Sequence, residues 1–134
     1  MKLRVVMSFA LVLGLVAAGG PLFAHHGNVA YDTSKAVVLK GATVTKLQWA
    51  NPHCFVMFDM KDENGNIVHW AGEVGSPQAL GLIGWTRNSV QPGDVITVYI
   101  YQAKSGRPVG RLNKIVLADG TELKDSALGY RDVE

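Results

Sequence analysis

The sequence has few features that hold a small fold together covalently. It contains one cysteine, Cys54, in 134 residues, so no disulfide can form within the chain. It also contains no CxxC or HExxH motif, no glycine-rich phosphate loop and no Ser/His/Asp spacing typical of a nucleophile. The sequence therefore lacks the motifs that mark the common thiol, zinc and nucleotide enzymes. The domain must therefore be stabilised by packing, or by packing together with a bound metal.

The sequence lacks an excess of charge of either sign. Without Lys2 and Arg4, the 13 Lys and Arg fall to 11 and balance the 11 Asp and Glu. A neutral domain has no basic surface for nucleic acid and no electrostatic attraction to an acidic membrane. We therefore expect no nucleic-acid partner.

The one long apolar run lies at the start of the chain. It extends from Val5 to Ala18 after a positive start, and a Gly-Gly-Pro break leads to Ala24. This order is typical of a secretory signal, and 14 residues are fewer than the roughly 20 that cross a bilayer. The sequence predicts that residues 1–24 are a cleaved signal peptide, with Ala18 as the alternative cut, and that the mature protein is periplasmic with no membrane span.

The remainder alternates between β-rich segments and turns. The expected strands are 37–49, 53–61, 67–74, 95–101 and 112–117. Ser76 and Pro77 are typical of a helix start, and the helix is expected to end near Gly84. Three strands, a helix and two strands is the order of an OB-type barrel. We therefore predict an all-β fold, a small five-stranded OB-like barrel at 37–123 with one short helix between strands 3 and 4. An arm at 25–36 precedes it, and a loose tail at 124–134 follows it.

The loop of the central hairpin determines which side chains face the core. A three-residue loop, Glu63–Gly65 with Gly65 left-handed, places Phe58 opposite Trp70 and Cys54 opposite Val74. A two-residue turn would shift this register by one and break the apolar face. We prefer the three-residue loop, which predicts that Trp70 is buried and that Cys54 is a core thiol.

Two adjacent histidines follow the expected cut. Cleavage after Ala24 would make His25 the N-terminus, where its amino and ring nitrogens can bind one metal ion together. A third nitrogen from another histidine completes a T-shaped set, which suits Cu(II) and, less selectively, Zn(II) or Ni(II). In the alternative interpretation, His25 and His26 are only a polar, loose terminus.

The hairpin supplies the candidate third ligand. His53 begins the second strand, and Glu73 projects from the same face, where it could bind the metal or orient a ligand. The alternatives are a strand-end histidine bonded to backbone and a solvated glutamate. His69 is expected opposite Asp59, roughly 20 Å along the strand from His53, as a surface pair outside the site.

Eight short motifs are spread over the mature chain. They are His25-His26-Gly27, Leu39-Lys40-Gly41, Val44-Thr45-Lys46, Trp49-Ala50-Asn51-Pro52-His53, Trp70-Ala71-Gly72-Glu73, Gly75-Ser76-Pro77, Gly84-Trp85-Thr86-Arg87 and Pro92-Gly93-Asp94. Together they resemble a family of small exported bacterial proteins catalogued as a domain of unknown function. The resemblance implies a periplasmic β-barrel without an established activity.

The resemblance also bears on the site residues. The family pattern has a double histidine at the mature start, the histidine of Asn-Pro-His and the glutamate, matched here by His25, His26, His53 and Glu73. His69 stands where the family commonly has asparagine, and Cys54 also departs from the usual residue, so neither is expected in the site.

The sequence thus predicts a periplasmic metal-binding carrier, sensor or accessory protein, with copper as the first choice and His25, His26, His53 and Glu73 as the site. A role other than catalysis is favoured. The alternative is a metal-free interaction module that binds a partner protein or small ligand. A copper oxidase acting on polysaccharide is the third interpretation, disfavoured because no flat aromatic platform is evident.

Overall fold

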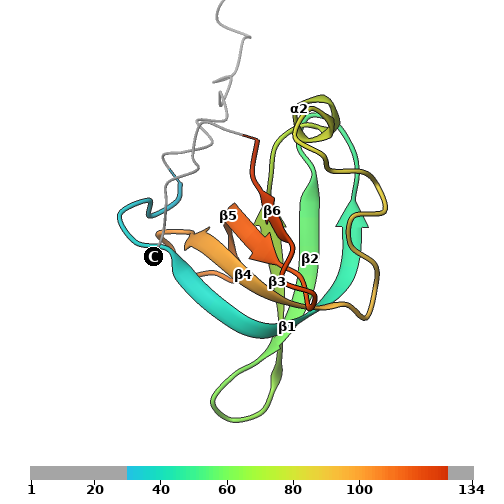
Figure 1. The fold of residues 1–134 in the computed structure, drawn as a ribbon. Helices are drawn as coiled ribbons and strands as arrows, with labels where there is room; N and C mark the ends of the chain where they lie inside the picture. Colours follow the sequence, from blue (N-terminus) through green and yellow to red (C-terminus); the bar gives the residue numbers. More distant parts are fainter. Residues whose placement is uncertain (1–29, 127–134) are drawn as a thin grey trace, which may run out of the picture.

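A computed structural model describes residues 30–126 of the chain. His25, His26 and the expected signal peptide lie outside the described residues, as do residues 127–134. The elements are β1 Val37–Gln48, β2 Phe55–Lys61, β3 Ile67–Glu73, α2 Pro77–Gly81, β4 Val95–Gln102, β5 Val109–Val116 and β6 Glu122–Lys124 (Figure 1). In this part of the chain, no helix is long and apolar enough to cross a membrane.

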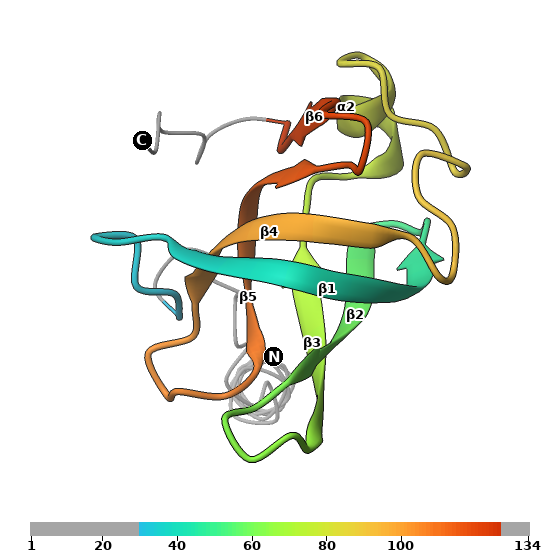
Figure 2. The same ribbon diagram turned by 60° about the horizontal axis from the view of Figure 1, so that its bottom comes forward.

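The strands close into a barrel. Their order is β3-β2-β1-β4-β5-β6, with antiparallel neighbours, and a parallel pairing between β3 and β5 joins the two ends of the five-stranded set. β6 is a short addition that pairs with β5. Figure 2 shows β1 and β4 crossing in front of β2, β3 and β5. The prediction of an all-β, five-stranded OB-like barrel with one short helix between strands 3 and 4 is confirmed.

β1 is long enough to pair with two different neighbours. It pairs with β4 over Val37–Thr43 and with β2 over Thr43–Gln48. The register with β4 shifts between Lys40 and Ala42, where Gly41 has a φ of 75°. A left-handed glycine in a bulge bends the strand, so β1 can serve both sides of the barrel.

Helix α2 covers one end of the barrel (Figure 1). The Ser76 side chain accepts a hydrogen bond from the Ala79 N–H at 3.2 Å, and a proline follows at the first helical position. Its Leu80 side chain is fully buried among the strand residues of the core. The helix ends at Gly81, earlier than the expected end near Gly84.

The predicted hairpin register is also confirmed. Phe58 pairs with Trp70, their rings stack with centroids 6.1 Å apart, and Gly65 has a φ of 84°. Asp62 N–H donates to the Asn66 carbonyl at 2.9 Å, which leaves a three-residue loop. The predicted burial of Trp70 is met only in part, because its side chain packs against the core but remains partly exposed.

The end of the domain differs from the expected loose tail. Lys124 belongs to β6, and Asp125 is only 4% exposed. The Trp85 ring N–H donates to the Lys124 carbonyl at 2.8 Å. Lys124 is therefore held to the barrel through its backbone, and the Asp125 side chain is packed inside it.

Candidate functional site

The structure brings His53 and Glu73 into direct contact. β2 and β3 are antiparallel, with Phe55 opposite Glu73, so the start of one strand lies beside the end of the other. Nδ1 of His53 contacts Oε1 of Glu73, and the side chains are 44% and 11% exposed. A nearly buried carboxylate thus occupies one ring nitrogen, and Nε2 is the nitrogen left for a ligand.

Two further side chains hold the Glu73 carboxylate. The Tyr31 hydroxyl donates to Oε2 at 2.5 Å. Arg111 lies opposite Glu73 in the parallel pairing, with Nη1 3.6 Å from Oε1. Burial, and next the hydrogen bond to Glu73, raise the pKa of Tyr31. The hydroxyl therefore keeps its proton and remains a donor to the carboxylate.

Asp125 holds the Arg111 side chain that approaches Glu73. Its Oδ2 lies 2.6 Å from both Nε and Nη2 of Arg111. Its Oδ1 accepts hydrogen bonds from the N–H groups of Gly75 and Ser126, at 2.8 and 2.7 Å. Asp125 therefore connects β5 to the segment after β3 and to the end of the domain. Arg111 lies between two carboxylates, which limits how far Glu73 can move.

The start of the described chain lies at the same place. Tyr31 forms an isolated bridge with Ala103, just after β4. Asp32 N–H donates to the Gln102 carbonyl at 2.9 Å, and Lys104 N–H donates to the Ala30 carbonyl at 3.0 Å. Residues 30–32 are therefore attached to the barrel beside Glu73.

The described residues alone do not complete a metal site. Within 30–126, no group of three or more His, Cys, Asp or Glu side chains could hold a metal ion. The other two predicted ligands, His25 and His26, lie outside the described residues. Cys54 is a core residue, as predicted, and burial raises the pKa of its thiol.

His69 lies near the other end of β3. Its Nδ1 is 2.6 Å from Oδ1 of Asp59, and its side chain is 82% exposed. The register pairs these two residues directly. His69 is thus the surface partner of Asp59, apart from His53, as the sequence predicts.

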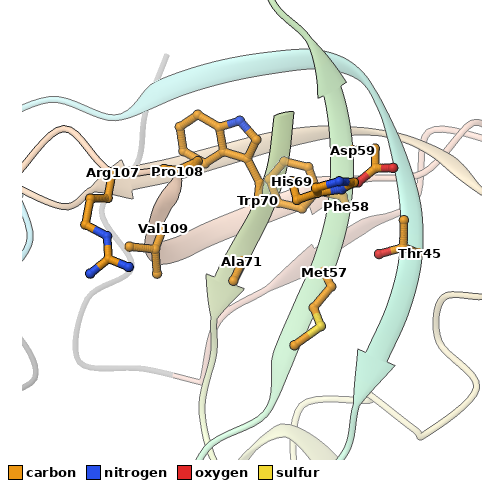
Figure 3. A pocket seen from close by; sticks show the side chains of 10 residues that line it. All are labelled: Thr45, Met57, Phe58, Asp59, His69, Trp70, Ala71, Arg107, Pro108 and Val109. Atoms are coloured by element: carbon orange, nitrogen blue, oxygen red, sulfur yellow. The ribbon is translucent and has the colours of Figure 1, made fainter. Parts of the chain in front are cut away.

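A groove of about 670 Å³ crosses β2 and β3 at this other end. Its lining residues are Thr45, Met57, Phe58, Asp59, His69, Trp70, Ala71, Arg107, Pro108 and Val109. Figure 3 shows Arg107 at one end, Thr45 at the other, and the His69–Asp59 pair beside Thr45. The groove does not include His53 or Glu73.

Sequence reasoning did not single out Tyr31, Arg111 or Asp125. Tyr31 falls in the expected arm and Asp125 in the expected tail, where no periodicity marks a contact. Arg111 could have been found from the barrel alone, because closing an OB-type barrel pairs the end of β3 with the start of β5.

Neither curated proteins nor solved structures gave a match to the chain. One family description did match, over residues 12–112. This range contains the four predicted site residues and most of the barrel. The chain belongs to a family of unknown function (DUF6152).

Proposed function

We propose that the protein is exported to the periplasm and binds one transition-metal ion, with copper as the first choice and zinc or nickel as alternatives. The ligands are Nε2 of His53, the His25 amino and ring nitrogens, and the neighbouring His26. The contact between His53 and Glu73 is the observation that supports this proposal. Metal-binding imidazoles usually donate their second N–H to a carboxylate or carbonyl, which orients the ring and increases its basicity.

Glu73 acts on the metal through His53 in this proposal. Its Oε1 contacts His53 and its Oε2 accepts the Tyr31 hydroxyl, so both oxygens already have partners. Its negative charge favours a cation on the far side of the imidazole. The Glu73 geometry supports an orienting role over direct ligation.

The N-terminal histidines can reach His53. His26 precedes Tyr31 by five residues and His25 by six, and five extended residues span up to about 17 Å. The Tyr31 hydroxyl is already on the carboxylate that contacts His53. Cleavage after Ala24 would therefore leave the new terminus within reach of Nε2.

A surface site of this kind suits transfer of an ion better than chemistry on a substrate. The exposed side of His53 can be approached by another protein, which could deliver or collect the metal. We therefore propose a carrier, sensor or accessory role. Copper is favoured because the two His25 nitrogens and Nε2 of His53 would form a T-shaped set that suits Cu(II), with the His26 imidazole as a further nitrogen donor.

The test is a Cu(II) titration of protein that begins at His25, by competition with a chelator of known affinity. A peptide of residues 25–32 gives the baseline, since an amine and adjacent imidazoles bind copper without a barrel. We expect the protein to bind more tightly than the peptide. His53→Ala should remove that advantage and lower the affinity at least about 10-fold, since even the loss of an outer-shell partner of a metal ligand costs that much.

His69→Ala is the matched control, because His69 is also a β-hairpin histidine with a carboxylate on Nδ1. It should leave the affinity unchanged. One extra residue before His25 should weaken binding. Protein that binds no better than the peptide would contradict the proposal, as would equal effects of the two histidine variants.

The groove supports the second candidate, a metal-free interaction module. Its volume, about 670 Å³, falls in the usual range of small-ligand sites. Trp70 and Pro108 give it apolar surface, and Arg107 and His69 add polar groups. Binding of a ligand or partner that Arg107→Ala and Trp70→Ala abolish, in protein that takes up no metal, would favour this candidate.

A further inference from the structure

We propose that the open edge of β3 binds an extended acidic peptide segment as an added strand, with Arg107 as the anchor for a carboxylate of that segment. The inference rests on the second candidate function, an interaction module at the groove, and names the class of partner that the groove takes. It does not depend on metal binding at His53.

The first half of β3 has a neighbouring strand on one side only. β3 pairs with β2 over Ile67–Glu73, whereas its parallel pairing with β5 covers only Ala71–Glu73. Within the described part of the chain, the positions from Ile67 to Trp70 therefore form an open edge. Such an edge presents unpaired N–H and C=O groups, which can pair with a strand of another chain.

The register identifies the backbone groups that face this open side. The Ala71 N–H donates to the Pro108 carbonyl at 3.1 Å, on the side of β3 away from β2. The direction of the backbone groups alternates along a strand, so those of Ile67 and His69 face the same side as those of Ala71. A peptide strand placed there would continue the ladder that Ala71 begins.

The groove of about 670 Å³ lies along this edge. Figure 3 shows Trp70, Pro108 and Arg107 on the side of β3 away from β2. The side chains of an added strand would alternate between two faces. One set would pack against Trp70 and Pro108, and the other set would lie on the outer face with His69. Alternating apolar and acidic residues therefore fit the groove best.

Unpaired positive charge favours an acidic partner. Within the described part of the chain, the Arg107 guanidinium and the Lys61 ammonium take part in no ion pair. Arg107 lies at one end of the groove, and Lys61 is opposite Ile67 in the register. The carboxylate in the groove, on Asp59, already contacts His69. An incoming carboxylate would meet an unopposed guanidinium, whose planar fork suits bidentate binding.

The probe is a short peptide of alternating valine and glutamate, titrated into metal-free, isotope-labelled protein and followed by NMR. Binding should protect the Ile67 and His69 amides from hydrogen exchange and leave the Val68 and Trp70 amides, which face β2, unchanged. A peptide with lysine in place of glutamate should bind more weakly.

Substitutions in the loop before β5 test the anchor. Arg107→Ala should lower the affinity for the glutamate peptide about 5-fold, the upper end for an exposed ion pair. Lys104→Ala is the matched control, because it removes a cation of the same loop that does not line the groove. It should leave the affinity unchanged, as should His53→Ala.

The backbone pairing is tested from both partners. Only every second N–H of the peptide would face β3, so N-methylation at the valines or at the glutamates should abolish binding, but not both. His69→Pro removes an N–H from the open edge, where proline is tolerated, and should weaken binding. His69→Ala, which removes only the side chain, should not.

Three results would overturn the proposal in different ways. Equal affinity for the glutamate and lysine peptides would exclude an acidic partner. Binding that needs Arg107 but withstands both N-methylation patterns would keep the groove as a ligand site and overturn the added strand. Unchanged exchange at Ile67 and His69 with saturating peptide would overturn the edge as the binding site. Because the protein is metal-free in this titration, these failures are distinct from a failure of the copper site.

Discussion

Replacing Asp125 by asparagine tests the packing beneath the site. The aspartate side chain is fully buried and pairs with Arg111 through two contacts of 2.6 Å. It also accepts hydrogen bonds from the Gly75 and Ser126 N–H groups. Asparagine keeps the volume and one acceptor oxygen but removes the charge. The substitution therefore isolates the ion pair from the shape of the side chain.

The expected loss of stability is large. Removing one partner of a buried ion pair costs about 3–5 kcal/mol, because the other charge stays buried without compensation. The Arg111 side chain is 18% exposed and retains a contact with Glu73, so water and that carboxylate relieve part of the cost. We expect Asp125→Asn to lower the free energy of unfolding by about 3 kcal/mol, the lower end of that range.

Urea denaturation followed by tryptophan fluorescence measures this loss. Trp85 is a suitable reporter because its ring N–H donates to the carbonyl of the residue before Asp125. Glu122→Gln is the control, since the Glu122 side chain is 40% exposed where it contacts Lys114 at 2.7 Å, and ion pairs of exposed carboxylates contribute little. If Asp125→Asn costs no more than Glu122→Gln, the Asp125–Arg111 pair does not hold the domain end in place.

Three further outcomes follow from the geometry. Trp70→Ala should cost about 2–3 kcal/mol in urea unfolding, below the range for fully buried tryptophan because the ring is only partly buried; a cost near zero would contradict its core contact. Gly75→Ala should cost about 1–3 kcal/mol, because the new Cβ would lie 1.8 Å from Ser126 Oγ and 2.9 Å from its Cβ, whereas Gly81→Ala meets open space and should not destabilise. Because folding raises the pKa of Tyr31, the stabilisation from its hydroxyl is complete below about pH 10 and is lost as the pH rises further. The difference in free energy of unfolding between the parent and Tyr31→Phe should therefore shrink from about pH 8 to 11. A constant difference would show that the Tyr31 hydroxyl does not donate to Glu73 in the folded state.

Most of the fold could be predicted from local sequence patterns. Alternation along the hairpin and the length of the loop ending at Gly65 set the register, and that register places His53 near Glu73. The same reasoning overestimated the burial of Trp70. Alternation determines which face a side chain takes, whereas its exposure depends on the tertiary surroundings, and Trp70 lines the groove between β3 and the loop before β5.

The contacts that hold Glu73 in place could not be predicted from local sequence patterns. Arg111 reaches Glu73 only because β3 and β5 close the barrel, and Asp125 reaches Arg111 only because the chain end folds back along β5. Tyr31 meets Glu73 across 42 positions. These contacts depend on closure of the whole chain, so no periodic pattern in the surrounding sequence marks them.

His53 and His69 show what the tertiary structure adds. Both place Nδ1 against a carboxylate of the same hairpin. The Glu73 side chain is 11% exposed and tied to Tyr31 and Arg111, whereas Asp59 is 27% exposed. A buried carboxylate fixes an imidazole more firmly than an exposed one, which favours His53 as the ligand.

A metal site shared between the N-terminus and the barrel is tested most directly by the electron paramagnetic resonance spectrum of Cu(II) bound to protein beginning at His25. One copper should bind per chain with several nitrogen ligands, and isotope labelling of histidine should alter an imidazole signal in the spectrum. His53→Ala should remove one nitrogen from that set, and His69→Ala should leave the spectrum unchanged. A spectrum identical to that of the free 25–32 peptide, insensitive to His53→Ala, would contradict a site shared between the N-terminus and the barrel.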